Sequence, residues 1–142
     1  MIDGVRIRPL DQICDDRGRL MHMLRSDAED FEGFGEVYFS TVYPGAVKAW
    51  HLHRREIQHY AVPSGMVHLV MYDARDGSPT KGELQHVYLG EWNYVLVRIP
   101  SGVVNGFKCV GDRMAIVCNC PTIPFEKDDV IQVDPKTVPH SW

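Results

Sequence analysis

The sequence has no long apolar run, no basic run and no CxxC cysteine pair. No segment approaches the ~20 apolar residues that a membrane span needs, and residues 1–20 contain no uninterrupted apolar stretch like that of a signal peptide. We therefore expect a cytoplasmic protein with no membrane partner. The net charge is −4 over 142 residues. Without a basic cluster there is no electrostatic footprint for nucleic acid, so a bound phosphate must be held by a few well-placed cations.

The cysteines are few, and none belongs to a CxxC motif. Cys118 and Cys120 are two residues apart, so we expect them on one face of one strand, where they could form half of a zinc site. Neither Cys14 nor Cys109 has a neighbouring cysteine that would complete such a site. The pattern favours four reduced and mostly buried thiols.

Helical patterns are nearly absent. Only Arg25–Phe34 resembles a helix, and Gly33 and Gly35 would end it quickly. Short apolar or alternating runs separated by Gly- and Pro-containing turns dominate instead. These runs are Val37–Val42, Val47–His53, Gln58–Val62, Met66–Tyr72, Leu84–Leu89, Tyr94–Ile99, Phe107–Val110 and Met114–Cys118. Regular spacing of this kind predicts an all-β protein, an antiparallel sandwich or barrel.

The chain length suits one domain with a single core, and we expect residues 1–142 to form it. Residues 121–142 are rich in proline, which is rarely found in central strands. We expect this C-terminal extension to lie over the barrel in extended segments.

The stretch Gly45–Gly65 organises the rest of the sequence. His51 and His53 alternate along one strand and should point to the same side, and Gln58 and Tyr60 form a similar pair on the returning strand. Two imidazoles and an amide then project into one volume.

A second motif, at Pro100–Phe107, completes this pattern. Pro100 and Gly102 form a tight corner between two strands, and Asn105 should face the same cavity as the histidines. The two motifs together resemble the cupin signature, with Gln58 in place of Glu and Asn105 in place of His. The resemblance implies a cupin jelly-roll barrel.

Nearly the whole chain resembles the dTDP-4-dehydrorhamnose 3,5-epimerase family of cupins, in particular its shorter members. The resemblance rests on the order and intervals of several motifs, which are Asp15-Asp16-Arg17-Gly18, Gly45 to His51, Gln58, the segment Tyr72–Thr80, Ile99–Gly102 and Asp134-Pro135. It implies a homodimer that exchanges edge strands, and isomerisation of a nucleotide-linked 4-keto-6-deoxy sugar without metal or organic cofactor.

The resemblance also implies roles for particular residues. The family's catalytic base lands on His51 and its carboxylate partner on Asp134, an arrangement that would charge and orient the imidazole. Arg17 matches an arginine that reaches the nucleotide phosphates, across the dimer. Lys48 replaces a second arginine of the family. A guanidinium that can bind a phosphate through two N–H groups is thereby replaced by an ammonium, which acts as a point charge.

Three departures from the family pattern bear on the chemistry. The segment Ala115–Cys118 lacks the family's acid tyrosine, Tyr60 replaces a lysine and Asn105 replaces a histidine. A one-centre epimerase or a ketoisomerase is therefore favoured over a full 3,5-epimerase. Tyr60 and Tyr38 are the available phenols. The paired histidines resemble those of sugar 3,4-ketoisomerases, which favours His53 as a second acid-base group.

Two other classes remain open on the sequence. His51, His53, Gln58 and Asn105 occupy the four positions that hold the ion in a metal-dependent cupin, although two neutral amides make a weak ligand set. A binding domain that keeps the nucleotide-sugar pocket without catalysis is the other alternative.

Overall fold

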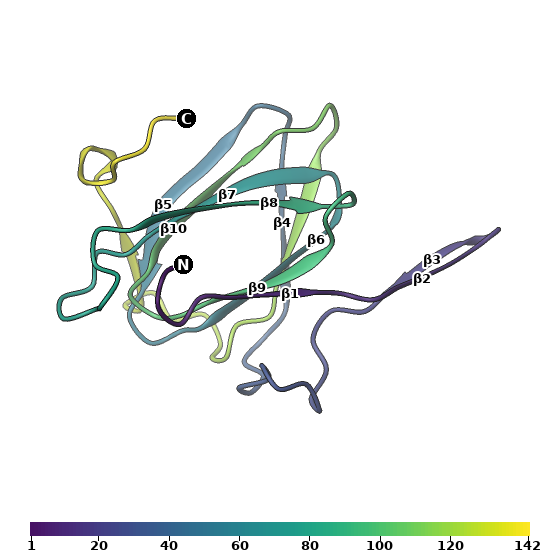
Figure 1. Cartoon of the computed structure of the whole chain (residues 1–142), viewed down its shortest axis with the longest axis horizontal. Coiled ribbons are helices and arrows are strands. Elements are labelled where there is room, and N and C mark those ends of the chain that lie inside the picture. The colour runs from purple at the N-terminus through teal and green to yellow at the C-terminus, as the bar shows by residue number, and fades with distance from the viewer.

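The computed structural model describes residues 1–142, and strands account for nearly all of its regular structure (Figure 1). The strands are β1 (Arg6–Pro9), β2 (Gln12–Asp15), β3 (Gly18–Met21), β4 (Tyr38–Val42), β5 (Val47–His53), β6 (Gln58–Ser64), β7 (Met66–Tyr72), β8 (Leu84–Gly90), β9 (Val95–Ile99), β10 (Val104–Cys109), β11 (Ala115–Asn119) and β12 (Val130–Gln132). A single 3₁₀ turn, η1, covers Pro135–Thr137. No helix here has the length and apolarity that a membrane span requires.

Two five-stranded antiparallel sheets form the body of the protein. The first has the order β1-β9-β6-β11-β4 and the second the order β12-β5-β10-β7-β8. From β4 onwards the chain passes back and forth between the sheets, except that β7 and β8 are neighbours in the second sheet. The predicted all-β antiparallel fold is confirmed. A separate hairpin of β2 and β3 projects away from the body (Figure 1).

The main core lies between the two sheets. Eighteen buried residues form one cluster there, among them Leu69 and Met71 from β7 and Val97 from β9. Val70 lies between Leu69 and Met71 in sequence and therefore faces the opposite side of the second sheet. Both faces of this sheet consequently need apolar cover.

The C-terminal segment provides that outer cover. Its strand β12 pairs with β5 at the edge of the second sheet. Beyond it, Val138 packs with Trp50, Val70 and Val104, and Trp142 stacks on Trp50 with ring centroids 5.0 Å apart. The segment runs beside β5 in Figure 1. This packing fixes the strand that carries the two histidines.

The helix predicted at Arg25–Phe34 is wrong. Only isolated turn bonds form there, from Ala28 N to Arg25 O and from Phe31 N to Ala28 O. Asp30 is buried and binds the guanidinium of Arg8 through both carboxylate oxygens, at 2.9 and 3.1 Å. This long-range ion pair holds the segment as an irregular loop.

Candidate functional site

A cavity of about 310 Å³ opens between the two sheets. The first sheet contributes Tyr38, Ser40, Tyr60, Val117 and Asn119, and the second contributes Lys48, Ala49, His51, Phe107 and Gln132. The volume falls within the range of small-molecule sites. Because one wall comes from each sheet, the cavity can hold a ligand between groups of different chemistry.

Strand register places a row of polar groups along the first wall. Asn119 of β11 is opposite Tyr38 of β4 on one side and opposite Tyr60 of β6 on the other. Directly paired residues on neighbouring strands point to the same face of a sheet. The two phenols therefore flank one amide at the cavity surface.

A β-bulge shapes the second wall. Asn105 of β10 is opposite His51, but Phe107, two residues further on, is opposite Lys48, three residues earlier on β5. The extra residue in β5 reverses the alternation, so Lys48 and His51 both line the cavity despite their odd spacing. Gly106 permits this geometry, because a Cβ there would lie 2.4 Å from the Cβ of Ala49.

His51 presents a neutral imidazole to the cavity. Burial, and to a smaller extent the neighbouring His53, lowers its pKa from 6.5 to about 4. The two rings are 5.5 Å apart in a T-shaped arrangement, as expected for side chains on one face of β5. At neutral pH the ring of His51 can accept a proton.

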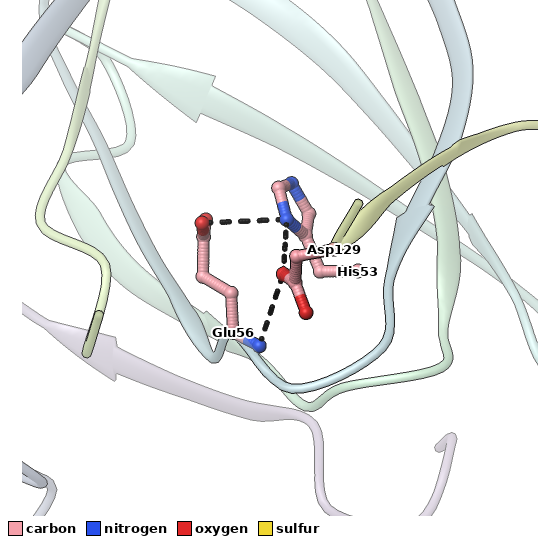
Figure 2. A group of neighbouring side chains, drawn as sticks. All are labelled: His53, Glu56 and Asp129. Carbon is pink, nitrogen blue, oxygen red and sulfur yellow. Dashed lines mark hydrogen bonds and ion pairs between the residues drawn. The ribbon is translucent and has the colours of Figure 1, made fainter. Parts of the chain in front are cut away.

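His53 is buried. Figure 2 shows its ring beside the carboxyl groups of Asp129 and Glu56. Its Nδ1 is 3.1 Å from Oδ2 of Asp129 and 3.3 Å from Oε2 of Glu56. Burial lowers the pKa of His53, against the opposing effect of Asp129. The hydrogen bond to Asp129 fixes a proton on Nδ1, since Asp129 can only accept.

Asp129 is a well-satisfied anion. Burial alone would raise its pKa, but hydrogen bonds from His53, from the backbone N–H groups of Arg55 and Glu56 and from the Arg55 side chain lower it overall. This carboxylate therefore stays charged and orients the ring of His53.

Two amides form a buried chain beside the phenols. Asn105 Nδ2 donates to Gln58 Oε1 at 2.9 Å, and Gln58 Nε2 donates to Tyr60 Oη at 2.7 Å. Gln58, Tyr60 and Asn105 thus meet in one hydrogen-bonded chain, but of the residues expected to face the cavity, His53, Gln58 and Asn105 do not line it. Gln58 and Asn105 are almost completely buried and act from behind the cavity wall.

The hydrogen bonds that the two phenols accept from side-chain amides leave the phenolic protons free. Asn119 Nδ2 donates to Tyr38 Oη at 2.8 Å, just as Gln58 donates to Tyr60. Since each phenol oxygen accepts from an amide, its own O–H can donate to a ligand. Burial raises the pKa of both phenols, that of Tyr60 well above its ordinary value. Both therefore remain protonated at neutral pH.

Asp134 does not pair with His51. It precedes η1 as its N-cap, and its carboxylate accepts from the backbone N–H of Lys136 at 3.0 Å. An exposed Asp before Pro satisfies this local turn instead of reaching the cavity. The buried carboxylate in this part of the chain is Asp129, and its partner is His53.

Arg17 lies far from the cavity in the fold of one chain. It is at the turn of the β2–β3 hairpin, strongly exposed, and pairs with Asp15. Lys48 does line the cavity, where its Nζ donates to Ser40 Oγ at 2.9 Å. One chain thus supplies only one of the two predicted phosphate contacts.

The four positions of a metal-dependent cupin offer only a weak ligand set here. Gln58 accepts from Asn105 and donates to Tyr60, so its amide is used on both sides. His53 directs Nδ1 to the carboxylate of Asp129. The ring of His51, the second nitrogen of His53 and Oδ1 of Asn105, which has no hydrogen-bond partner, remain. Two imidazoles and one neutral amide oxygen make a weak ligand set for a divalent ion.

Sequence reasoning missed Glu56, Asn119 and Asp129. Glu56 follows two arginines, and Asp129 ends a charged run at 126–129, so both resemble surface residues. Nothing in their local pattern distinguishes them from solvated charges. Asn119 could have been found, since it follows Val117 by two residues and shares its face of the strand.

Known proteins are similar to this chain over nearly its whole length. The family model described as dTDP-4-dehydrorhamnose 3,5-epimerase matches residues 1–142. The chain is 39% identical over 130 residues to the probable low-salt glycan biosynthesis epimerase Agl13 of Haloferax volcanii, covering 90% of this chain and 83% of that protein. It is 37% identical over 139 residues to the spore coat polysaccharide biosynthesis protein SpsL of Bacillus subtilis, covering 98% and 90%.

A solved structure is similar throughout. The crystal structure of a dTDP sugar isomerase from Desulfovibrio desulfuricans G20 superposes with a TM-score of 0.97 at 44% identity, covering 99% of this chain and 92% of that one. The match extends over both sheets and the cavity between them, which is where the cupin-like motifs lie. The chain therefore belongs to the dTDP-4-dehydrorhamnose 3,5-epimerase family.

Proposed function

We propose that this protein is an epimerase or isomerase of polysaccharide biosynthesis that acts, without metal or organic cofactor, on a 4-keto-6-deoxy sugar linked to a nucleoside diphosphate. One observation carries the proposal. The neutral imidazole of His51 on one cavity wall is opposed by two protonated phenols, Tyr38 and Tyr60, on the other. Inversion next to a ketone needs a base and an acid arranged in this way.

The chemistry divides between the two walls. His51 removes a proton from the carbon next to the ketone, and its lone pair is available because the ring is neutral. The electron pair moves onto the ketone oxygen, where a phenolic O–H stabilises the enolate. A proton returned to the opposite face of the carbon completes the inversion. Tyr60 and Tyr38 are the candidate donors, and His53 is a second acid-base group behind the base.

The diphosphate requires a cation near the sugar. Lys48 provides one at the cavity, held beside Ser40 of β4. Arg17 would supply the second from another copy of the chain. The family resemblance and the position of the hairpin both favour such an exchange.

The dimer that we propose uses the β2–β3 hairpin as its arm. Ile13 and Leu20 are cross-strand partners on this hairpin and are 62% and 55% exposed. β4 is an edge strand of the first sheet, and Phe39 on it is 64% exposed. An exposed apolar edge needs cover, and a hairpin from a second copy would provide it. Since β4 carries Tyr38 and Ser40, this contact would bring Arg17 towards the partner's cavity.

The four free cysteines support a cytoplasmic location for this dimer, because thiols stay reduced there.

Two experiments test the function. A thermal-shift screen of dTDP, GDP, UDP and CDP should show stabilisation by at least one, since a ligand at a hundred times its Kd adds about 2.7 kcal/mol. Incubation of a nucleotide-linked 4-keto sugar in D₂O should place deuterium on a ring carbon. Nucleotide binding without any deuterium exchange would indicate a binding domain without catalytic activity. No stabilisation by any nucleotide would contradict the proposal as a whole.

A further inference from the structure

Glu56 is a buried carboxylate without a cation of its own. Its side chain is 3% exposed, Oε2 lies 3.3 Å from Nδ1 of His53, and Oε1 has no hydrogen-bond partner. An unpaired charge in such a place is costly, and a group of this kind usually stays neutral. The position therefore calls for a proton or a cation.

The neighbouring charges do not provide the cation. Asp129 is the nearest carboxylate, and Arg55, the one guanidinium at hand, pairs with Asp129, Glu126 and Asp128. His53 is neutral at neutral pH because burial lowers its pKa. Glu36 adds a further negative charge. The one guanidinium at hand is thus engaged by other carboxylates, and Glu56 has no cation.

We propose that Glu56 holds a proton inside the barrel, and that this proton, together with the burial of the ring, keeps His53 neutral behind the catalytic wall. Glu56 is then a positioning residue that acts through His53. Loss of its proton would place a negative charge 3.3 Å from the imidazole and favour the imidazolium form. A charged His53 would in turn lower the basicity of His51, whose ring is 5.5 Å away. The catalytic part of this inference rests on the proposed function, but the proton itself does not.

The pKa of Glu56 agrees with the geometry. Burial, with the charges of Asp129 and Glu36, raises it from 4.5 to about 7, against a smaller opposing effect of the Asn119 side chain. Glu56 should therefore exchange its proton near neutral pH, well above an ordinary glutamate. The phenols of Tyr38 and Tyr60 also face it and stay protonated in this range.

Carbon-13 NMR tests the proton directly. In protein labelled with [¹³C]glutamate, one side-chain carboxyl should titrate with a midpoint near pH 7, and Glu56→Gln should remove that resonance. No substrate is needed, so the result is independent of the enzymatic activity. Titration of all glutamate carboxyls below about pH 5 would overturn the proposal. So would a stoichiometric divalent ion found by elemental analysis, because the carboxylates of Glu56 and Asp129 and the ring of His53 lie close enough to share one.

The pH dependence of the free energy of unfolding provides a second test of the proton on Glu56. The folded protein binds the proton of Glu56 more tightly than the unfolded chain does, so this residue makes the wild type lose stability as pH rises from about 4.5 to 7. Glu56→Gln has no carboxyl group to titrate at this position and lacks this loss of stability. Its midpoint of urea unfolding should therefore rise relative to the wild type across this window. A constant difference would contradict the proposal.

The pH profile of deuterium exchange separates positioning from structure. Wild-type exchange should decline above about pH 7, and Glu56→Gln should retain exchange without that decline. Glu126→Gln is the matched control, because Glu126 binds the same Arg55 at the surface. An unchanged profile in Glu56→Gln would show that Glu56 does not influence the base. If neither protein exchanges but the NMR midpoint is near 7, the proposed function fails and the buried proton stands.

Discussion

At the scale of single residues, His51 is the group on which the proposed chemistry depends. It lines the cavity with a neutral ring that no carboxylate charges. His51→Ala should reduce deuterium exchange into a 4-keto sugar by on the order of 10²–10⁴-fold, the usual contribution of a general base. Nucleotide binding, followed by thermal shift, should change only a few-fold because Lys48 remains. Undiminished exchange would show that the base is another group, with His53 as the next candidate.

The two phenols can be separated by paired substitutions. Tyr60→Phe should lose net inversion while exchange survives, if Tyr60 returns the proton. It also removes the acceptor of Gln58 Nε2, so a cost of about 1–3 kcal/mol in unfolding free energy should accompany it. Tyr38→Phe is the matched variant, since Tyr38 accepts from Asn119 in the same manner. Loss of inversion in Tyr38→Phe alone would assign the acid to Tyr38.

Much of the cavity wall could be predicted from the sequence, because strand alternation and the family motifs can both be recognised in short stretches of the chain. His51, Lys48, Tyr38 and Tyr60 line the cavity as expected. The partner of the histidine pair could not be placed in this way. Asp134 and Asp129 both lie in the C-terminal segment, and only the pairing of β12 with β5 decides which of them is buried beside a histidine.

At the scale of elements, the bulge between β5 and β10 determines what the second wall presents. Gly106→Ala would place a Cβ 2.4 Å from that of Ala49, so the bulge must shift. We expect a loss of about 1–3 kcal/mol in unfolding free energy, typical of overpacking, together with a fall in exchange activity. Gly111→Ala is the control, because its nearest contact would be 3.8 Å away. Equal effects of the two substitutions would contradict this role of the bulge.

The elements themselves show where sequence patterns succeed. Val47–His53 and Met66–Tyr72 form strands with the predicted bounds, since glycine and proline precede each run and charged residues follow it. The helix expected at Arg25–Phe34 does not form, because the carboxylate of Asp30 binds Arg8, a partner remote in sequence. The inward direction of Lys48 also depends on a bulge, which simple alternation does not reveal.

At the scale of the whole molecule, the projecting hairpin should make the protein a dimer. Sedimentation at micromolar concentration should give twice the mass of one chain, and Ile13→Asp should shift it to the monomer because it places a charge in the apolar pair with Leu20. Val110→Asp, at another exposed apolar position, is the control. If Arg17 acts across the dimer, Ile13→Asp should also weaken nucleotide binding. A wild-type monomer would remove this arrangement.

The stacked indoles on the outer face of the second sheet give the protein a built-in optical signal. Trp50 precedes His51 on β5, so one side chain faces the cavity while its neighbour rests against Trp142. A ligand that displaces the strand at His51 should alter the overlap of the two rings and hence their fluorescence emission. Trp92, which is 89% exposed, would contribute a constant background. Occupancy of the cavity can thus be followed in unlabelled protein from the opposite side of the sheet.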